Sequence, residues 1–130
     1  MLVKLTLGTS VVTFLSVYAP QSGLPESEKV KFYDHLQQII SNISSSEHLF
    51  ICGDLNGHIG LDSSGYEGVH GGFAFGERNV EGERLLEISV ANNLVICNSF
   101  FAKHESHFIT YESGPSLSQV DYILCRKRDR

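Results

Sequence analysis

The stretch Phe50-Ile51-Cys52-Gly53-Asp54-Leu55-Asn56-Gly57-His58-Ile59-Gly60 decides how the rest of the chain is interpreted. Its apolar start predicts a buried strand, and Gly53 lets the chain turn where that strand ends. The turn presents the Asp54 carboxylate and the Asn56 carboxamide at the strand's carboxyl end, where open α/β sheets place their binding sites. One side chain could accept a proton from water while the other donates to a phosphoryl oxygen. Asp, Asn and Gly are also turn formers, so the same letters equally fit a plain turn.

Composition predicts one domain and gives no sign of a basic, polyanion-binding surface. The 130 residues are 42% hydrophobic, with a net charge of −5. The acidic balance weighs only weakly against nucleic acid, because metal-dependent nucleases gather acids in their sites. Cys52, Cys97 and Cys125 lie in apolar runs without CxxC spacing, which predicts buried free thiols in a reducing compartment, intracellular and either nuclear or cytoplasmic. No membrane span or signal peptide is expected.

Hydrophobic spacing predicts a mixed order of strands and helices. An antiparallel hairpin is expected first, followed by an amphipathic helix over the sheet, the buried strand before Asp54 and a long packed loop. Asn79 can cap a second helix that ends at Asn92-Asn93. This order favours an α/β fold with a sheet covered by helices. The expected strands are residues 2–7, 11–17, 49–52, 94–97, 107–111 and 119–125, the first helix is residues 26 to about 44, and the loop is residues 61–78.

Three more polar residues stand near expected strand ends. Tyr18 ends the second strand, where its phenol can reach a phosphate or simply serve as a core aromatic. Asp121 lies in an apolar run, where a charge is costly unless it is paired or functional. His58 follows the Asp-x-Asn pattern and could lie near phosphate, although an ordinary loop histidine is the simpler interpretation.

Five motifs in order along the chain resemble the endonuclease/exonuclease/phosphatase superfamily. Within it, the chain looks most like the apurinic-like endonuclease domains of non-LTR retrotransposons and the related craniofacial development protein 2-like proteins. The helix Asn79–Leu85 is similar to the same group. The motifs are Val17-Tyr18-Ala19-Pro20, Cys52-Gly53-Asp54-Leu55-Asn56, Asn98-Ser99-Phe100, Thr110-Tyr111 and Ser118-Gln119-Val120-Asp121-Tyr122-Ile123-Leu124.

The resemblance implies a fold, an activity and a set of site residues. The fold would be part of a DNase I-like four-layer α/β sandwich, with two mixed sheets face to face and helices outside. The activity would be Mg²⁺-dependent hydrolysis of DNA phosphodiesters by in-line attack of water. By the same resemblance, Asp54 would orient or deprotonate the water, Asn56 would donate to the scissile phosphate beside Tyr18, Asp121 would hold a catalytic histidine, and Thr110 and Asn98 would contact nucleic acid.

The chain also departs from the superfamily pattern. The metal-binding glutamate motif and the closing Ser-Asp-His have no counterpart in residues 1–130. The resemblance therefore implies a partial domain without the N-terminal strands and the C-terminal end, with an incomplete Mg²⁺ site and no assigned metal ligand. Missing segments or a partner chain would cover its exposed sheet edges.

Two functions remain open. The first is a retrotransposon-derived DNA endonuclease domain that is inactive as this chain. The second is a non-catalytic nucleic-acid or protein interaction module, or a gene-model fragment of a longer reverse-transcriptase-linked protein. A lipid or sugar phosphatase is disfavoured because residues 118–124 resemble the retroelement branch.

Overall fold

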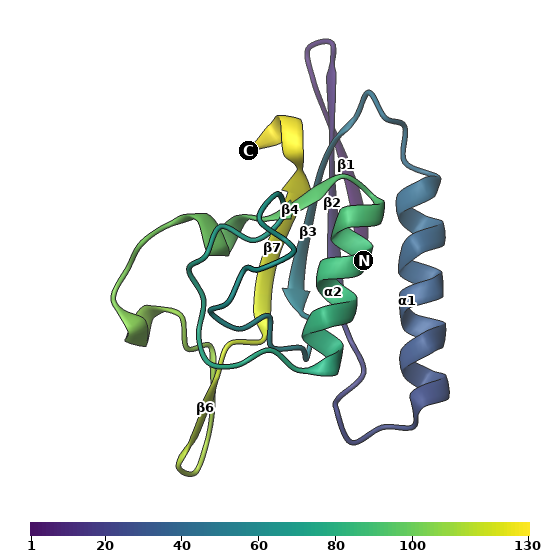
Figure 1. Ribbon diagram of the computed structural model, residues 1–130. Helices are drawn as coiled ribbons and strands as arrows, with labels where there is room; N and C mark the ends of the chain where they lie inside the picture. Colours follow the sequence, from purple (N-terminus) through teal and green to yellow (C-terminus); the bar gives the residue numbers. More distant parts are fainter.

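One five-stranded sheet organises the chain, and the computed structural model describes all of residues 1–130 (Figure 1). The strand order is β1-β2-β3-β7-β4. A separate two-stranded hairpin, β5-β6, projects from it. The strands are β1 (Leu2–Leu7), β2 (Ser10–Tyr18), β3 (His48–Asp54), β4 (Leu94–Ile96), β5 (Tyr111–Ser113), β6 (Ser116–Ser118) and β7 (Asp121–Arg126).

The sheet is mixed, and its single parallel pair sets the position of the site. β1 and β2 form the expected antiparallel hairpin. β2 and β3 run parallel, joined through helix α1 (Glu26–Ser41), whereas β7 pairs antiparallel with both β3 and β4. The carboxyl ends of β2 and β3 therefore meet at one edge of the sheet, with Tyr18 in register with Asp54.

Two helices lie on the same side of the sheet (Figure 1). α1 buries Leu36 and Ile40, and α2 (Val80–Ala91) buries Leu85 and Leu86 against the core. The expected Asn79 cap is confirmed, because its side chain accepts a hydrogen bond from the backbone of α2. Neither helix combines the length and the hydrophobicity that crossing a membrane requires.

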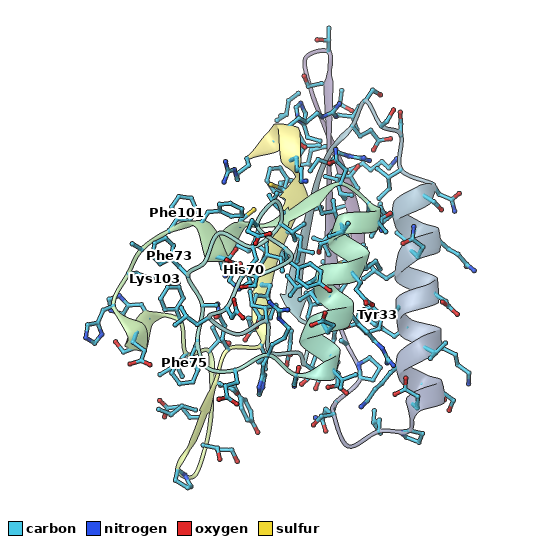
Figure 2. The ribbon with its side chains drawn as sticks, viewed as in Figure 1. Tyr33, His70, Phe73, Phe75, Phe101 and Lys103 are labelled. Carbon is cyan, nitrogen blue, oxygen red and sulfur yellow. The ribbon has the colours of Figure 1, made fainter.

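A polar contact joins the two helices within this layer. Figure 2 shows Tyr33 on the side of α1 that faces α2, where its hydroxyl donates to the Glu81 carbonyl at 3.4 Å. Lys29, nearly buried, forms an ion pair with the Glu81 carboxylate. Burial raises the pKa of Tyr33 to about 12, so its phenol stays protonated and keeps this contact at physiological pH.

The long loop between β3 and α2 packs as an ordered part of the core, as expected. Val69 and His70 are fully buried, and Figure 2 shows His70 inside the loop. The His70 Nε2 atom lies 2.6 Å from the Gly60 carbonyl oxygen, and Nδ1 accepts from the Gly72 backbone at 2.9 Å. The Ile96 backbone donates to the Val69 carbonyl, so the loop also covers the free edge of β4.

The segment before β7 differs from the sequence prediction. Residues 107–111 do not form one strand. A 3₁₀ turn covers Glu105–His107, and the strand begins only at Tyr111. Gly114 lies at the tip of the β5-β6 hairpin, and the final strand begins at Asp121 rather than at residue 119. Two further 3₁₀ turns are Cys97–Phe100 and Lys127–Asp129.

The cysteines are all free, as expected, but only one of them is buried. Cys125 is buried, whereas Cys52 and Cys97 are partly exposed. Cys52 itself points away from the helices, in register with the exposed Ile123, toward a face of the sheet that has no second layer.

That uncovered surface, here called the open face, is apolar. Side chains alternate along a strand, so residues in register with Phe14 share its face. Phe14 stacks on Phe50 with ring centroids 5.5 Å apart. The predicted α/β class is confirmed, and the chain contributes one sheet and its helical layer; residues 1–130 do not form the facing sheet. Exposed side chains on the open face are Val3, Leu5, Leu7, Phe14 and Ile123.

Candidate functional site

The site lies where β2 and β3 end, and Gly53 allows the two strands to approach there. Gly53 has φ +150°, and a Cβ at this position would collide with the Val17 carbonyl oxygen. A glycine is therefore required on steric and conformational grounds. The close approach brings Tyr18 and Asp54, which are in register, to the same edge.

Asp54 and Asn56 form a compact turn that is tied to the end of β2. The Asp54 Oδ1 atom accepts from the Asn56 backbone at 2.9 Å, and Asn56 takes the left-handed φ of 46° that asparagine tolerates. The Asn56 Nδ2 group donates to the Ala19 carbonyl at 2.7 Å. One amide hydrogen and the Oδ1 atom of Asn56 stay available to a ligand.

The Asp54 carboxylate sits in an environment that favours its protonated form. Partial burial raises its pKa, the hydrogen bond from Asn56 lowers it, and the Asp121 carboxylate raises it again. Asp121 is directly in register with Asp54 across the β3-β7 pair. Two carboxylates thus stand side by side at the strand ends, and a raised pKa is what a general base near neutral pH needs.

A cavity of about 310 Å³ opens over these strand ends. Its size is at the low end of the range for small-ligand sites. Three of the predicted site residues line it, namely Tyr18, Asp54 and Asn56. The remaining lining residues are Gln21, Ser22, Gly23, His58, Asn79, Tyr111, Ser118 and Val120.

The phenol of Tyr18 points to solvent in this cavity, as a ligand-binding group would. Its side chain is 63% exposed, so it is not the core aromatic that the sequence also allowed. Its hydroxyl oxygen accepts a long hydrogen bond of 3.3 Å from Gln21. The phenol remains free to donate to an incoming oxygen atom.

The other three predicted residues lie outside the cavity lining. Asp121 is half-buried beside Asp54, and its carboxylate makes no hydrogen bond or ion pair with a histidine. The Thr110 hydroxyl accepts from the Val120 and Asp121 backbones at 3.1 and 3.2 Å, so it orders the start of β7. Asn98 Oδ1 accepts from the Ile123 backbone at 2.6 Å, beside the open face.

Sequence reasoning missed the contributions of Asn79 and Tyr111 to the cavity. Asn79 was predicted only as a helix cap, although the same position places it beside the loop that follows Asn56. Tyr111 reaches the cavity because the base of the β5-β6 hairpin, Tyr111 and Ser118, lies beside the ends of β2 and β3. A local sequence pattern carries no signal for the contact of Tyr111 with a distant segment. The place of Asn79 in the cavity could have been inferred from its predicted position as a helix cap.

The chain's own residues fit a magnesium ion only in part. No group of three or more histidine, cysteine or acidic side chains is placed to hold a metal. The neighbouring Asp54 and Asp121 carboxylates do offer the oxygen ligands that Mg²⁺ prefers, and Mg²⁺ is commonly held by one or two carboxylates with water and substrate phosphate.

With this geometry in view, the fold can be classified. Along 95% of its length the chain superposes on an endonuclease/exonuclease/phosphatase family protein from Leptotrichia buccalis, with a TM-score of 0.58 and 17% sequence identity. It covers 39% of that protein. The structure therefore has the endonuclease/exonuclease/phosphatase, DNase I-like fold that the motifs predicted.

Sequence comparison adds a more particular relationship. The chain is 37% identical over 121 residues to craniofacial development protein 2 of Bos taurus and 36% identical to that of Tragulus javanicus. Both matches cover 92% of this chain, which spans about a fifth of the length of those relatives. No protein-family model matches. The predicted resemblance to craniofacial development protein 2 is confirmed.

Proposed function

We propose that residues 1–130 carry the phosphodiester-binding side of a Mg²⁺-dependent DNA hydrolase of retrotransposon origin, and that they do not complete catalysis alone. The observation that carries the proposal is the cavity in which Asp54, Asn56 and Tyr18 converge at adjoining strand ends. The nuclease-like fold supports DNA as partner. The retrotransposon origin rests on the motifs at residues 17–20, 52–56 and 118–124.

Each cavity residue has a definite part in this proposal. The Asp54 carboxylate accepts a proton from the attacking water, for which its raised pKa suits it. The free amide hydrogen of Asn56 and the Tyr18 hydroxyl donate to non-bridging phosphoryl oxygens, where negative charge develops. Because Ala19 already holds the Asn56 amide, this donor is oriented before DNA binds.

Magnesium is the proposed cofactor, with Asp121 as the carboxylate ligand that this chain would supply and the remaining ligands from water and phosphate. When bound, it would neutralise negative charge on the phosphate. The incomplete ligand set within residues 1–130 is the reason that hydrolysis by this chain alone is not expected. Thr110 and Asn98 would act through the backbone of β7 and reach DNA only at the edge of the site.

The test separates binding from cleavage. Supercoiled plasmid is incubated with the purified chain and Mg²⁺, beside an EDTA control and the Asp54→Ala variant, and binding of a short DNA duplex is followed in parallel by NMR. We expect shifts of the Asp54, Asn56 and Tyr18 signals without nicking.

Two outcomes would revise the proposal. Nicking that vanishes with EDTA and with Asp54→Ala would show that the chain is catalytically sufficient. A well-folded chain whose cavity signals ignore DNA would refute the binding site. It would leave a protein interaction module as the alternative.

A further inference from the structure

The candidate cavity contains a charge imbalance. Asp54 contributes a carboxylate, and Asp121 stands beside it. No lysine or arginine lines the cavity, so His58 is the one lining residue able to carry a positive charge. A phosphodiester brought next to Asp54 meets like charge at close range, and a nearby cation offsets that repulsion.

The backbone of His58 is held rigidly at the cavity. Its N–H donates to Asn79 Oδ1 at 2.9 Å, and its carbonyl accepts from the Asn79 backbone at 3.0 Å. Cβ atoms at Gly57 and Gly82 would collide with backbone here, so the loop lies directly against the first turn of α2. This packing fixes where the His58 side chain begins.

Buried contacts hold both neighbours of His58 as well. The Tyr122 hydroxyl lies 2.9 Å from the Gly57 carbonyl oxygen and accepts from the Ile59 backbone at 3.4 Å. Burial raises the pKa of Tyr122, so this group stays a neutral phenol. The loop is therefore a preorganised support, which lowers the entropic cost of ligand binding.

The His58 ring, in contrast, has no partner within the protein. His48 bonds to Asp129, His70 to Gly60 and Gly72, and His104 to Ser106. The His58 ring nitrogens make no hydrogen bond or ion pair and lie at the half-buried cavity wall. An imidazole on a fixed backbone, with free ring nitrogens at the cavity wall, is suited to bind a ligand.

We propose that His58 is a phosphate-binding residue of this site, whose imidazolium donates a hydrogen bond to a non-bridging oxygen of the DNA phosphate bound beside Asp54. This rests on the function proposed above and adds a binding residue to it. The other titratable groups that line the cavity are Asp54 on β3, Tyr18 on β2 and Tyr111 on β5, and Asp121 on β7 stands in register with Asp54. Glu81 on α2 is already paired with Lys29.

The experiment measures binding of a fluorescein-labelled DNA duplex without divalent cations, between about pH 8 and pH 5.5, where histidine gains its charge. Asp54 also loses its negative charge on acidification, which would by itself favour phosphate binding. Every protein compared in this experiment therefore carries Asp54→Asn. In this background we expect affinity to rise about three- to tenfold as pH falls. The rise should disappear in His58→Gln and persist in His35→Gln, which alters an exposed histidine of α1.

A second readout distinguishes direct contact from a structural role. On addition of DNA, the ring carbon and proton resonances of His58 should shift, while those of His35 should not. If His58→Gln keeps the full pH-dependent rise, or if the ring signals stay unmoved while the duplex binds, the inference is overturned and the proposed function stands. If the Asp54→Asn protein binds no DNA at any pH, the inference is overturned. If the wild-type chain with Mg²⁺ binds none either, the proposed function falls with it.

Discussion

At the scale of single residues, Asp54 lies where its charge is unfavourable. Partial burial and Asp121 both raise its pKa above the ordinary aspartate value, so the folded state binds a proton more tightly than the unfolded state. Stability attributable to this group is therefore present at low pH and is lost as pH rises through the folded pKa. Such a cost is typical of a residue retained for function.

Asp54→Asn should consequently raise the free energy of unfolding at pH 7. The gain should stay below about 1 kcal/mol, since partial exposure screens the charge. It should vanish below about pH 3.8, where the carboxyl is protonated in both states. Urea unfolding at the two pH values measures this, with the exposed Asp34→Asn on α1 as control. A destabilised variant at pH 7 would contradict the account.

Gly53 is the second residue on which the site depends. Gly53→Ala should lower the free energy of unfolding by at least about 2 kcal/mol, because both the backbone conformation and the Val17 carbonyl exclude a methyl group. Gly23→Ala is the matched control, as nothing lies within contact distance of a Cβ there. Thermal unfolding of the two variants compares them, and equal midpoints would contradict the predicted close approach.

At the scale of elements, the start of α2 connects the helical layer to the site. Asn79 Oδ1 accepts from Gly82 at 2.8 Å and from His58 at 2.9 Å. One side-chain atom thus caps the helix and anchors the cavity loop. Loss of this atom should affect both elements at once.

Asn79→Ala should cost about 1–2 kcal/mol of stability, the usual value for a lost cap. It should also speed amide exchange at His58 as well as at Gly82. Asn79→Asp keeps the acceptor oxygen and should preserve both stability and protection. Hydrogen exchange followed by NMR provides the measurement. Faster exchange at Gly82 alone would mean that the helix and the loop are independent.

Some strands and helices could be predicted from the sequence, and others could not. Local patterns placed β1, β2, β3 and α2 because alternation, apolar runs and the Asn79 cap are encoded within a few residues. The same patterns missed β5 and β6, whose hairpin residues carry little hydrophobic signal. In the site, Tyr18, Asp54 and Asn56 were found from motifs, whereas Tyr111 and Asn79 depended on contacts between distant segments.

At the scale of the whole molecule, the two faces of the sheet differ in their surroundings. One face packs on α1, α2 and the loop, where Leu49, Ile51 and Leu124 are almost fully buried. The open face leaves Leu5 46% exposed and Ile123 45% exposed. Contiguous apolar exposure of this kind is uncommon on a monomer and favours association.

This asymmetry predicts different outcomes for similar substitutions at adjacent residues of β7. Ile123→Thr keeps a β-branched residue on the open face, so the free energy of unfolding should change by no more than about 0.5 kcal/mol. Binding of a hydrophobic dye and self-association in sedimentation should both decrease. Leu124→Thr, one residue along the same strand, removes a fully buried side chain from the core and should cost about 2–4 kcal/mol. If both variants lost a comparable free energy of unfolding, the open face would be covered in solution.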